Sequence, residues 1–310
     1  MYLDDPTDLD IDALHDALFG GAIARFTDLA AMRDLVDFTQ EFVVDQLSPH
    51  TPIEIHRHLD RDELAETLAG VRHRFTNLAE TKKLWRAVFE AAGLDPDDTM
   101  RDRLVLRFQP PVPPSGEPHR ALSTGTVGFH RDTWGTNLYA QINWWAPVYP
   151  ITEGRTFAFA PAFFAKPIAN NSAGFDIAKV IDYNRKASSS ANRPEMVPRP
   201  LEALDANELK PVVIAPGEVI VFSSQHAHVG VPNHTDRTRI SLETRTLRLS
   251  DFHAGHGAAN VDGRARWIVL GFFRRVSDGE RLTDILGMES LVPFTGPMPP
   301  ESQESAKALR

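Results

Sequence analysis

Hydrophobic residues recur at helical spacing through the first third of the chain. Between residues 9 and 45 they stand three or four positions apart, and the same spacing returns between residues 61 and 92, where Gly93 follows. Side chains at this spacing share one face of an α-helix, so the pattern predicts helices with one buried face over both ranges. Asp28 is placed to cap a helix within the first range.

From Leu104 onward the pattern changes to short apolar or alternating runs separated by proline and glycine. Many short strands at such spacing are typical of a sandwich or jelly roll. The predicted strands cover residues 104–109, 125–132, 137–147, 155–161, 211–215, 218–223, 227–232, 238–248 and 266–273. The interval 162–210 has few strand signals and contains a serine-rich patch at 188–192, which favours a mobile, lid-like loop.

These patterns predict a single domain over residues 1–310. Residues 1–100 form a mostly helical part, and residues 101–275 form a mainly β core, a double-stranded β-helix or jelly roll of cupin-like type with flanking α-helices. The insert 162–210 lies within that core, and 276–310 is a C-terminal tail. A length of 310 residues with 42% hydrophobic content can bury a core of this size. From about Thr295 the tail is rich in Pro, Ser and Glu and is predicted to be loosely ordered.

Composition limits the classes of partner and chemistry. A formal net charge of −9 disfavours a nucleic-acid backbone or an anionic membrane surface as the principal partner. The chain has no cysteine, which excludes disulfides, thiolate catalysis and cysteine-ligated zinc or iron–sulfur sites. The first 25 residues are acidic, and no apolar run reaches 18 residues. We therefore expect a cytoplasmic enzyme that acts on a small molecule.

One pair of candidate metal ligands is His130 and Asp132. They are separated by a single residue in a predicted strand, so both side chains are expected to point to the same side. A His-x-Asp pair alone is weak evidence, because motifs of this size recur by chance and are more often a solvated polar strand end than a ligand pair.

A second group of candidates lies 98 residues beyond His130. The turn 215–218 leads into the apolar run 219–222, and this predicted buried strand is followed by His226 and His228. These two histidines share a face, so the residues alone nominate either one. Two imidazoles and one carboxylate can occupy one face of Fe(II) and leave three coordination positions free, as in non-haem iron oxygenases.

Polar and charged side chains alternate along residues 238–248, where Arg239, Ser241, Glu243 and Arg245 share one face. On an exposed strand these charges would be solvated. Alternatively, a guanidinium pairs with a carboxylate through two hydrogen bonds, and a serine two residues away can donate to the same group. Arg239 and Ser241 therefore favour an acidic cosubstrate.

Taken together, these residues resemble the Fe(II)/2-oxoglutarate-dependent oxygenases, most closely the branch similar to phytanoyl-CoA dioxygenase. The resemblance runs from about Arg103 to Arg248. It implies that a His-x-Asp pair and a distal histidine bind iron, and that an arginine about eleven residues further on binds the far carboxylate of 2-oxoglutarate. Arg239 lies eleven residues after His228 and thirteen after His226. The resemblance thus selects His228 as the ligand and leaves His226 either a place beside the ligands or a structural role.

The resemblance implies Fe(II), 2-oxoglutarate and O2 as cofactor and cosubstrates. The implied reaction converts 2-oxoglutarate to succinate and CO2 and oxidises, most simply hydroxylates, an unactivated C–H bond of a metabolite, with specialised metabolism as the default source. Desaturation, ring formation and ketone formation are alternative outcomes. Two other classes stay open from the residues: a cupin-like metal-dependent isomerase or lyase, and a non-catalytic jelly roll that binds a small ligand.

Several further polar residues are candidates for the same site. Gln141 and Asn143 lie on the polar face of the predicted strand 137–147 and are candidates for contact with the cosubstrate or substrate. Arg107, Trp134 and Arg245 are candidates for substrate contact, with core packing as the alternative for Trp134. The remaining histidines are expected elsewhere. His56, His58 and His73 are surface or packing residues of the helical part, and His253 and His256 belong to a glycine-rich loop near the site mouth.

Overall fold

The computed structural model describes residues 2–112, 127–185, 195–202 and 205–299. Its main feature is a large sheet with the strand order β1-β2-β8-β5-β10-β3-β12, in which β4 also pairs with β10. The pair β1–β2 is parallel and the other pairs are antiparallel. The strands of this sheet are β1 (Tyr2–Asp4), β2 (Ile23–Phe26), β3 (Thr99–Arg101), β4 (Val105–Gln109), β5 (Ile142–Pro147), β8 (Val219–Ser223), β10 (Arg239–Arg248) and β12 (Arg274–Arg275).

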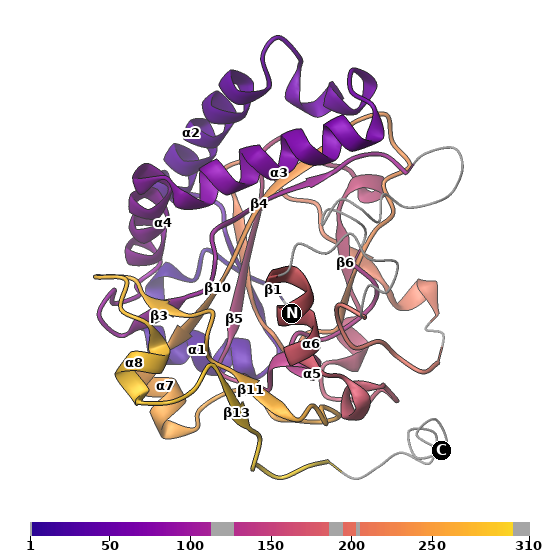
Figure 1. Cartoon of the computed structure of the whole chain (residues 1–310). Coiled ribbons are helices and arrows are strands. Elements are labelled where there is room, and N and C mark those ends of the chain that lie inside the picture. Colours follow the sequence, from indigo (N-terminus) through magenta and orange to yellow (C-terminus); the bar gives the residue numbers. More distant parts are fainter. Residues whose placement is uncertain (1, 113–126, 186–194, 203–204, 300–310) are drawn as a thin grey trace.

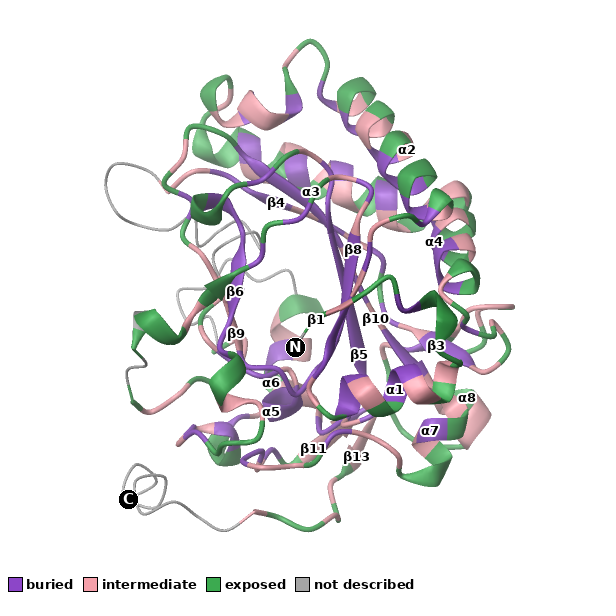
Figure 2. Ribbon diagram, turned by 180° about the vertical axis from the view of Figure 1, so that it is seen from behind, coloured by how far each residue is buried: buried purple, intermediate pink, exposed green. Residues whose placement is uncertain are grey.

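A smaller antiparallel sheet stands opposite the large one (Figures 1 and 2). Its order is β7-β6-β9, with β7 at Lys210–Pro211, β6 at Phe157–Phe159 and β9 at His228–Gly230. Apolar side chains from the inner faces of both sheets, among them Trp145, Ile220 and Phe157, form one buried cluster. Two facing antiparallel sheets around a shared core are the jelly-roll architecture. The predicted fold class, mainly β with flanking helices around such a core, is confirmed.

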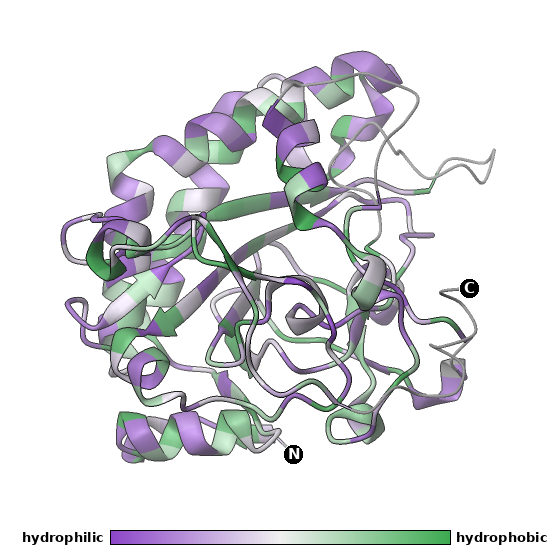
Figure 3. Cartoon of the chain, turned by 60° about the horizontal axis from the view of Figure 1, so that its bottom comes forward, coloured by the Kyte–Doolittle hydropathy of each residue, from purple (hydrophilic) through white to green (hydrophobic). Residues whose placement is uncertain are grey.

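Helices cover the outer face of the large sheet (Figure 1). They are α2 (Ala30–Leu47), α3 (Arg61–Asn77) and α4 (Ala79–Ala91). Their inward faces are buried and their outward faces are largely polar (Figures 2 and 3). Ile240 and Leu242 of β10 belong to the core cluster that includes Phe75 and Trp85 of these helices. Because side chains alternate along a strand, the polar residues of β10 are left facing the smaller sheet.

Most of the predicted strands are present, but several are shorter. The strands predicted at 104–109, 218–223 and 238–248 correspond to β4, β8 and β10, whereas those at 155–161, 227–232 and 266–273 shrink to β6, β9 and β11 (Trp267–Val269). The strand predicted at 211–215 overlaps β7 only at Pro211. The strand predicted at 137–147 begins only at Ile142. Asn137 has a φ of 50° and ends the short helix α5 (Thr133–Thr136), so the chain is not extended there.

The strand predicted at 125–132 is wrong over its described part. His130 forms only an isolated antiparallel bridge with His228, and α5 begins at Thr133. Residues 125 and 126 lie outside the described residues. Pairing of this segment with β9 is therefore limited to the bridge and to one further hydrogen bond, from the Gly230 N–H to the Val127 carbonyl at 2.9 Å.

The helical prediction over residues 9–45 missed a strand. Helix α1 (Ile11–Phe19) and helix α2 are separated by β2, which pairs with β8. Ile23 and Phe26 suit a helix by spacing, but both are buried where β2 completes the sheet. Asp28 does not cap α2, since the N-cap position is Leu29 and the Asp28 carboxylate accepts a hydrogen bond from Arg33 at 2.5 Å.

The helix predicted over 61–92 is two helices, because the backbone turns at Leu78, with ψ at 138°. Gly93 follows the second helix with a φ of 89°, a left-handed conformation that favours glycine. The first helix, α3, begins with a capping box. The Asp60 carboxylate accepts from the backbone N–H groups of Asp62 and Glu63, and the Glu63 carboxylate accepts from the Asp60 N–H.

We expect Asp60→Ala to lower the free energy of unfolding by about 1 kcal/mol, because it leaves helix N–H groups without their side-chain acceptor. Urea unfolding followed by circular dichroism measures the difference. Asp62→Ala is the matched control, since Asp62 enters the box only through its backbone N–H. Equal stability of the Asp60→Ala and Asp62→Ala proteins would contradict the capping role.

The insert and the tail are partly described. Residues 162–185 carry short turns and helix α6 (Ile177–Arg185), and the serine-rich patch 188–192 lies outside the described residues, so the lid stays a prediction. In the tail, helix α8 (Leu282–Leu286) precedes β13 (Leu291–Pro293), which pairs with β11. Residues 300–310, within the tail predicted to be loosely ordered, lie outside the described residues. Within the described ranges, no helix has the length and apolar character to cross a bilayer.

Candidate metal centre

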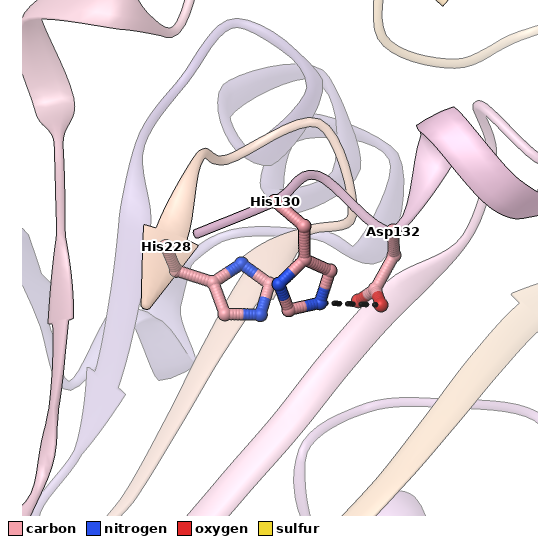
Figure 4. Close-up of side chains that lie close together, drawn as sticks. All are labelled: His130, Asp132 and His228. Atoms are coloured by element: carbon pink, nitrogen blue, oxygen red, sulfur yellow. Dashed lines mark ion pairs between the residues drawn. The ribbon is translucent and has the colours of Figure 1, made fainter. Parts of the chain in front are cut away.

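Three potential metal ligands converge where the two sheets meet. One ligand atom each of His130, Asp132 and His228 lies within 4.8 Å of the others, and this is the only such group among the described residues. Figure 4 shows the two imidazoles side by side with the carboxylate directed toward them. The ring centroids are 4.3 Å apart, and His130 Nε2 lies 3.5 Å from Asp132 Oδ1. A single ion can be bound by three ligands at this spacing.

Backbone pairing fixes the two histidines relative to each other. The His130 N–H donates to the His228 carbonyl at 3.0 Å, and the His228 N–H donates to the His130 carbonyl at 2.9 Å. Each ring also has a local partner, since Nδ1 of His130 lies 2.8 Å from the Gly128 carbonyl and Nδ1 of His228 lies 3.0 Å from the His226 carbonyl. A proton on each Nδ1 satisfies these carbonyls and leaves both Nε2 atoms free to bind a metal.

The protonation states suit a divalent cation. Burial lowers the pKa of His228 to about 4, so its imidazole is neutral at neutral pH. Burial opposes ionisation of Asp132, but the Arg245 guanidinium, 3.6 Å from Oδ1, and the two histidines hold the pKa of that carboxyl well below its usual range. His228 therefore offers a neutral nitrogen, and Asp132 an anionic oxygen, without first losing a proton.

His226 is not part of this group. Its two ring nitrogens lie 3.1 Å from the Ser223 carbonyl and 3.3 Å from the Gly21 carbonyl, and its ring packs against Phe159 and Phe164. Burial lowers the pKa of His226 to about 4. Its place agrees with the choice of His228 over His226 and with a structural role for the latter.

Arg239 lies on the inner face of β10, and its side chain presents unpaired donors there. The residue is 6% exposed, and its guanidinium lies 6.0 Å from the Trp145 ring centroid. Nε and Nη1 are buried and have no hydrogen-bond partner in the described part of the chain. Burial lowers the pKa of Arg239 to about 10, so it is still charged at neutral pH. A buried cation with unpaired donors is costly, and a bound carboxylate would remove that cost.

Ser241 and Arg107 are both engaged by Glu243. The Ser241 hydroxyl donates to Glu243 Oε1 at 3.1 Å, and Arg107 Nε donates to the two oxygens of Glu243 at 2.7 and 2.8 Å. Burial opposes ionisation of Glu243, but Arg107 and Arg239 lower the pKa of its carboxyl. Ser241 can contact a carboxylate at Arg239 only if it shares or leaves Glu243. Arg107, predicted to contact substrate, forms an ion pair with Glu243 instead.

Arg245 lies beside the metal group. Its guanidinium is 3.6 Å from Asp132 and 3.5 Å from the buried Asp102, and its side chain is 36% exposed. Burial opposes its charge, but the two carboxylates raise the pKa of Arg245. The structure thus places this predicted substrate residue next to the ligands, where it is shared between two carboxylates.

The other predicted contact residues are buried. Trp134 is fully buried and donates from Nε1 to Asp262 at 2.7 Å, so it leaves no surface for a substrate and has the alternative role in the core. Gln141 and Asn143 are also buried, and Asn143 Nδ2 donates to Asp132 Oδ2 at 2.5 Å. Asn143 thus contacts the predicted metal ligand directly, and Gln141 contacts Asn143.

Sequence reasoning missed Arg131 and Asp262. The Arg131 side chain points away from the ligands on either side of it and forms a buried ion pair with Asp262 at 3.1 Å. Its four other hydrogen bonds go to the carbonyls of Phe163, Phe164, Lys166 and Gln225. A charged residue between two predicted inward-facing ligands was the available signal, but its partners are distant in sequence.

Several histidines outside the site have structural partners. His256 contacts Asp251 and Asp16, both at 2.8 Å, and the buried His15 contacts Asp251 at 2.6 Å. His253 lies in helix α7 (Leu249–Ala254), so the predicted loop is partly helical. In the N-terminal part, His56 contacts Thr238, the rings of His50 and His58 stack, and His73 lies near Asn77.

Comparison with known proteins gives similar structures only. No family model and no curated protein matches the chain. Among solved structures, the non-haem alpha-ketoglutarate-dependent carbocyclase SnoK from nogalamycin biosynthesis is 13% identical, with 94% of this chain and 95% of that chain covered and a TM-score of 0.44. EvdO2 from Micromonospora carbonacea var. aurantiaca, solved with 2-oxoglutarate, is 14% identical, with 77% and 92% covered and a TM-score of 0.41.

A third similar structure is the non-haem monooxygenase ThoJ, which is 13% identical, with 71% of this chain and 70% of that chain covered and a TM-score of 0.41. These similar structures are thus non-haem oxygenases or 2-oxoglutarate-binding proteins at low sequence identity. The fold assignment rests on the two sheets and their shared core, and the resemblance to the phytanoyl-CoA dioxygenase branch stays a prediction.

Proposed function

We propose that this protein is a non-haem Fe(II)- and 2-oxoglutarate-dependent dioxygenase. In this proposal it hydroxylates an unactivated C–H bond of a small-molecule metabolite and converts 2-oxoglutarate to succinate and CO2. The observation that carries the proposal is the buried guanidinium of Arg239, whose Nε and Nη1 have no partner in the described residues, within the jelly roll that holds the ligand group. The ligand group is suited to bind a metal ion, and the unpaired guanidinium is suited to bind an acidic cosubstrate in the same jelly roll.

The ligand group fits Fe(II). His130, Asp132 and His228 would hold the metal through two imidazole nitrogens and one carboxylate oxygen, which leaves three coordination positions. When bound, Fe(II) with O2 supplies the oxidising chemistry that no side chain can provide. Arg239 would bind the far carboxylate of 2-oxoglutarate, with Ser241 as a second donor, and so orient the opposite end of the cosubstrate toward the metal ligands.

Charge balance on the inner face supports the same two guests. Arg107 pairs with Glu243, and Arg245 lies between Asp102 and Asp132. Because Arg245 is shared between these two carboxylates, Arg239 is the cation of this set that forms no ion pair in the described residues. A divalent cation at Asp132 and a dicarboxylate between that cation and Arg239 leave no charge uncompensated in this set.

The cosubstrate distinguishes this proposal from the two alternatives. A cupin-like isomerase or lyase needs the metal ligands but no carboxylate clamp, and a non-catalytic jelly roll needs neither. The unpaired donors of Arg239 favour a bound acid. Dependence of 2-oxoglutarate binding on both the metal and Arg239 is expected only of the dioxygenase.

The test is anaerobic absorption spectroscopy as Fe(II) and then 2-oxoglutarate are added to the purified protein. We expect a weak visible charge-transfer band that requires both additions. Arg239→Met should raise the Kd for 2-oxoglutarate about 10- to 100-fold, from the loss of charge-assisted hydrogen bonds of about 1.5–3 kcal/mol, with Fe(II) affinity retained.

Arg237→Met is the matched control, because Arg237 is exposed and lies two residues before Arg239. It should bind 2-oxoglutarate as the wild-type protein does. A folded, metal-bound wild-type protein that shows no band, or an Arg239→Met protein with unchanged 2-oxoglutarate affinity, would overturn the proposal.

A further inference from the structure

A hydrogen-bonded network of buried polar side chains leads from Asp132 into the protein. Asn143 Nδ2 donates to Asp132 Oδ2 at 2.5 Å, the Ser224 hydroxyl donates to Asn143 Oδ1 at 2.9 Å, and Gln141 Nε2 donates to Ser224 Oγ at 2.6 Å. Asn143 is 6% exposed, and Ser224 and Gln141 are fully buried. Gln141 Oε1 is buried without a hydrogen-bond partner among the described residues, so the network is satisfied, and thereby rigid, from Asp132 as far as the Gln141 NH2 group.

Paired strands hold this network in place. Asn143 is the second residue of β5 and Gln141 directly precedes that strand, while Ser224 directly follows β8. The strands β5 and β8 are hydrogen-bonded neighbours, and the Ser224 N–H donates to the Gln141 carbonyl at 3.0 Å. The network is therefore fixed by the centre of the large sheet, whereas Asp132 lies in the less regular segment between His130 and α5.

The direction of every hydrogen bond in this network follows from the charge on Asp132. An ionised carboxylate only accepts, so Asn143 must present its NH2 group to Asp132 and its oxygen to Ser224. The Ser224 hydroxyl has one proton, which then goes to Asn143, so Ser224 must accept from the NH2 group of Gln141. The four groups thus have a single consistent arrangement.

The two oxygens of Asp132 have different surroundings as a result. Oδ2 accepts from Asn143, whereas Oδ1 lies 3.5 Å from His130 Nε2 and 3.6 Å from Arg245. We propose that Asn143, supported by Ser224 and Gln141, is a positioning residue that holds the Asp132 carboxylate with Oδ1 toward the metal and Oδ2 withdrawn. This inference rests on the proposed function, and it assigns both amides to the metal ligand instead of the cosubstrate.

The expected effects are losses of metal affinity. Removing an outer partner of a metal ligand typically weakens binding about 10- to 100-fold, and we expect this range for Asn143→Leu. Ser224→Ala leaves Asp132 and Asn143 in place but removes the hydroxyl that fixes the Asn143 amide, so we expect a smaller loss, about tenfold. Ser224→Thr retains a hydroxyl and should restore most of the affinity.

The experiment is an anaerobic titration of each purified protein with Mn(II), followed by electron paramagnetic resonance, and with Co(II), whose visible absorption reports coordination geometry. Ser223→Ala is the matched control. Ser223 is the neighbouring fully buried serine, and its hydroxyl oxygen accepts from the Gln225 N–H at 3.2 Å. This hydrogen bond is not part of the network that leads to Asp132. We expect wild-type Mn(II) affinity and Co(II) spectrum in Ser223→Ala, and weaker binding with an altered spectrum in Ser224→Ala.

Folding of each variant is checked by circular dichroism and thermal unfolding. Folded Asn143→Leu and Ser224→Ala proteins that bind Mn(II) and Co(II) as the wild type does would overturn the positioning role and leave the proposed function intact. Equal losses in Ser224→Ala and Ser223→Ala would also overturn it, because they would indicate a general packing effect. A wild-type protein that binds no divalent metal would overturn both the role and the proposed function.

Discussion

Replacing Asp132 with alanine is expected to weaken Fe(II) binding by about two to three orders of magnitude and to abolish the proposed conversion of 2-oxoglutarate to succinate. Asp132 supplies the only carboxylate among the three converging ligands. Four-ligand structural zinc sites bind with about 10–16 kcal/mol, so one ligand contributes roughly 3–4 kcal/mol. The remaining two imidazoles are neutral donors, and they would not offset the charge of a divalent cation.

The measurement is equilibrium binding of Fe(II) under anaerobic conditions, together with succinate formation in air. Asp102→Asn is the control, because Asp102 is a buried carboxylate that contacts the same Arg245 guanidinium but is not one of the three ligands. It should keep most of the metal affinity. Wild-type affinity in the Asp132→Ala protein would contradict the ligand assignment.

The sequence predicted that His130 and Asp132 act together, but the reason was only partly right. Strand alternation was expected to place them on one side, whereas His130 lies in a two-residue bridge and Asp132 lies where α5 begins. The bridge itself joins His130 to His228 across 98 residues. The offset to Arg239 that the resemblance implies selected His228, and the structure places His228 beside His130 and Asp132. Such an offset can be seen in a sequence, whereas a pairing across 98 residues cannot.

Partnerships across strands were not predictable in the same way. Ser241 lies opposite Arg107 in the register of β10 with β4, and Glu243 lies two residues further along the same face. The sequence showed the charged face of β10 but not which cation would reach it, so Arg107 was expected to be free for a substrate. Strand β2 was missed for a related reason, because it forms by pairing with β8, which is distant in the sequence.

Replacing Arg131 with methionine is expected to lower the free energy of unfolding by about 3–5 kcal/mol, the usual cost of removing one partner of a buried ion pair. Arg131 is fully buried, and its five N–H donors are matched by Asp262 and the four backbone carbonyls of the 163–166 and 225 segments. Methionine fills similar volume but donates nothing. For a chain of this size the melting temperature should fall by roughly 5–8 °C. Arg131→Lys, which keeps the charge but not the planar set of donors, should lie between.

The size of that loss should depend on pH through Asp262. Burial already raises the pKa of this carboxyl, and Arg131 is the main group that opposes the rise. Without Arg131 the folded-state pKa rises further above the unfolded value, so the folded protein must bind a proton or hold an uncompensated charge as the pH increases. Thermal unfolding should therefore show a larger difference between wild type and Arg131→Met at pH 7.5 than at pH 5.

In the double variant with Asp262→Asn, the pH dependence of that difference should largely disappear, since no buried carboxylate remains at this position. A loss under about 1 kcal/mol at both pH values, small against the usual cost of breaking a buried pair, would show that the segments joined by Arg131 are held together by other contacts.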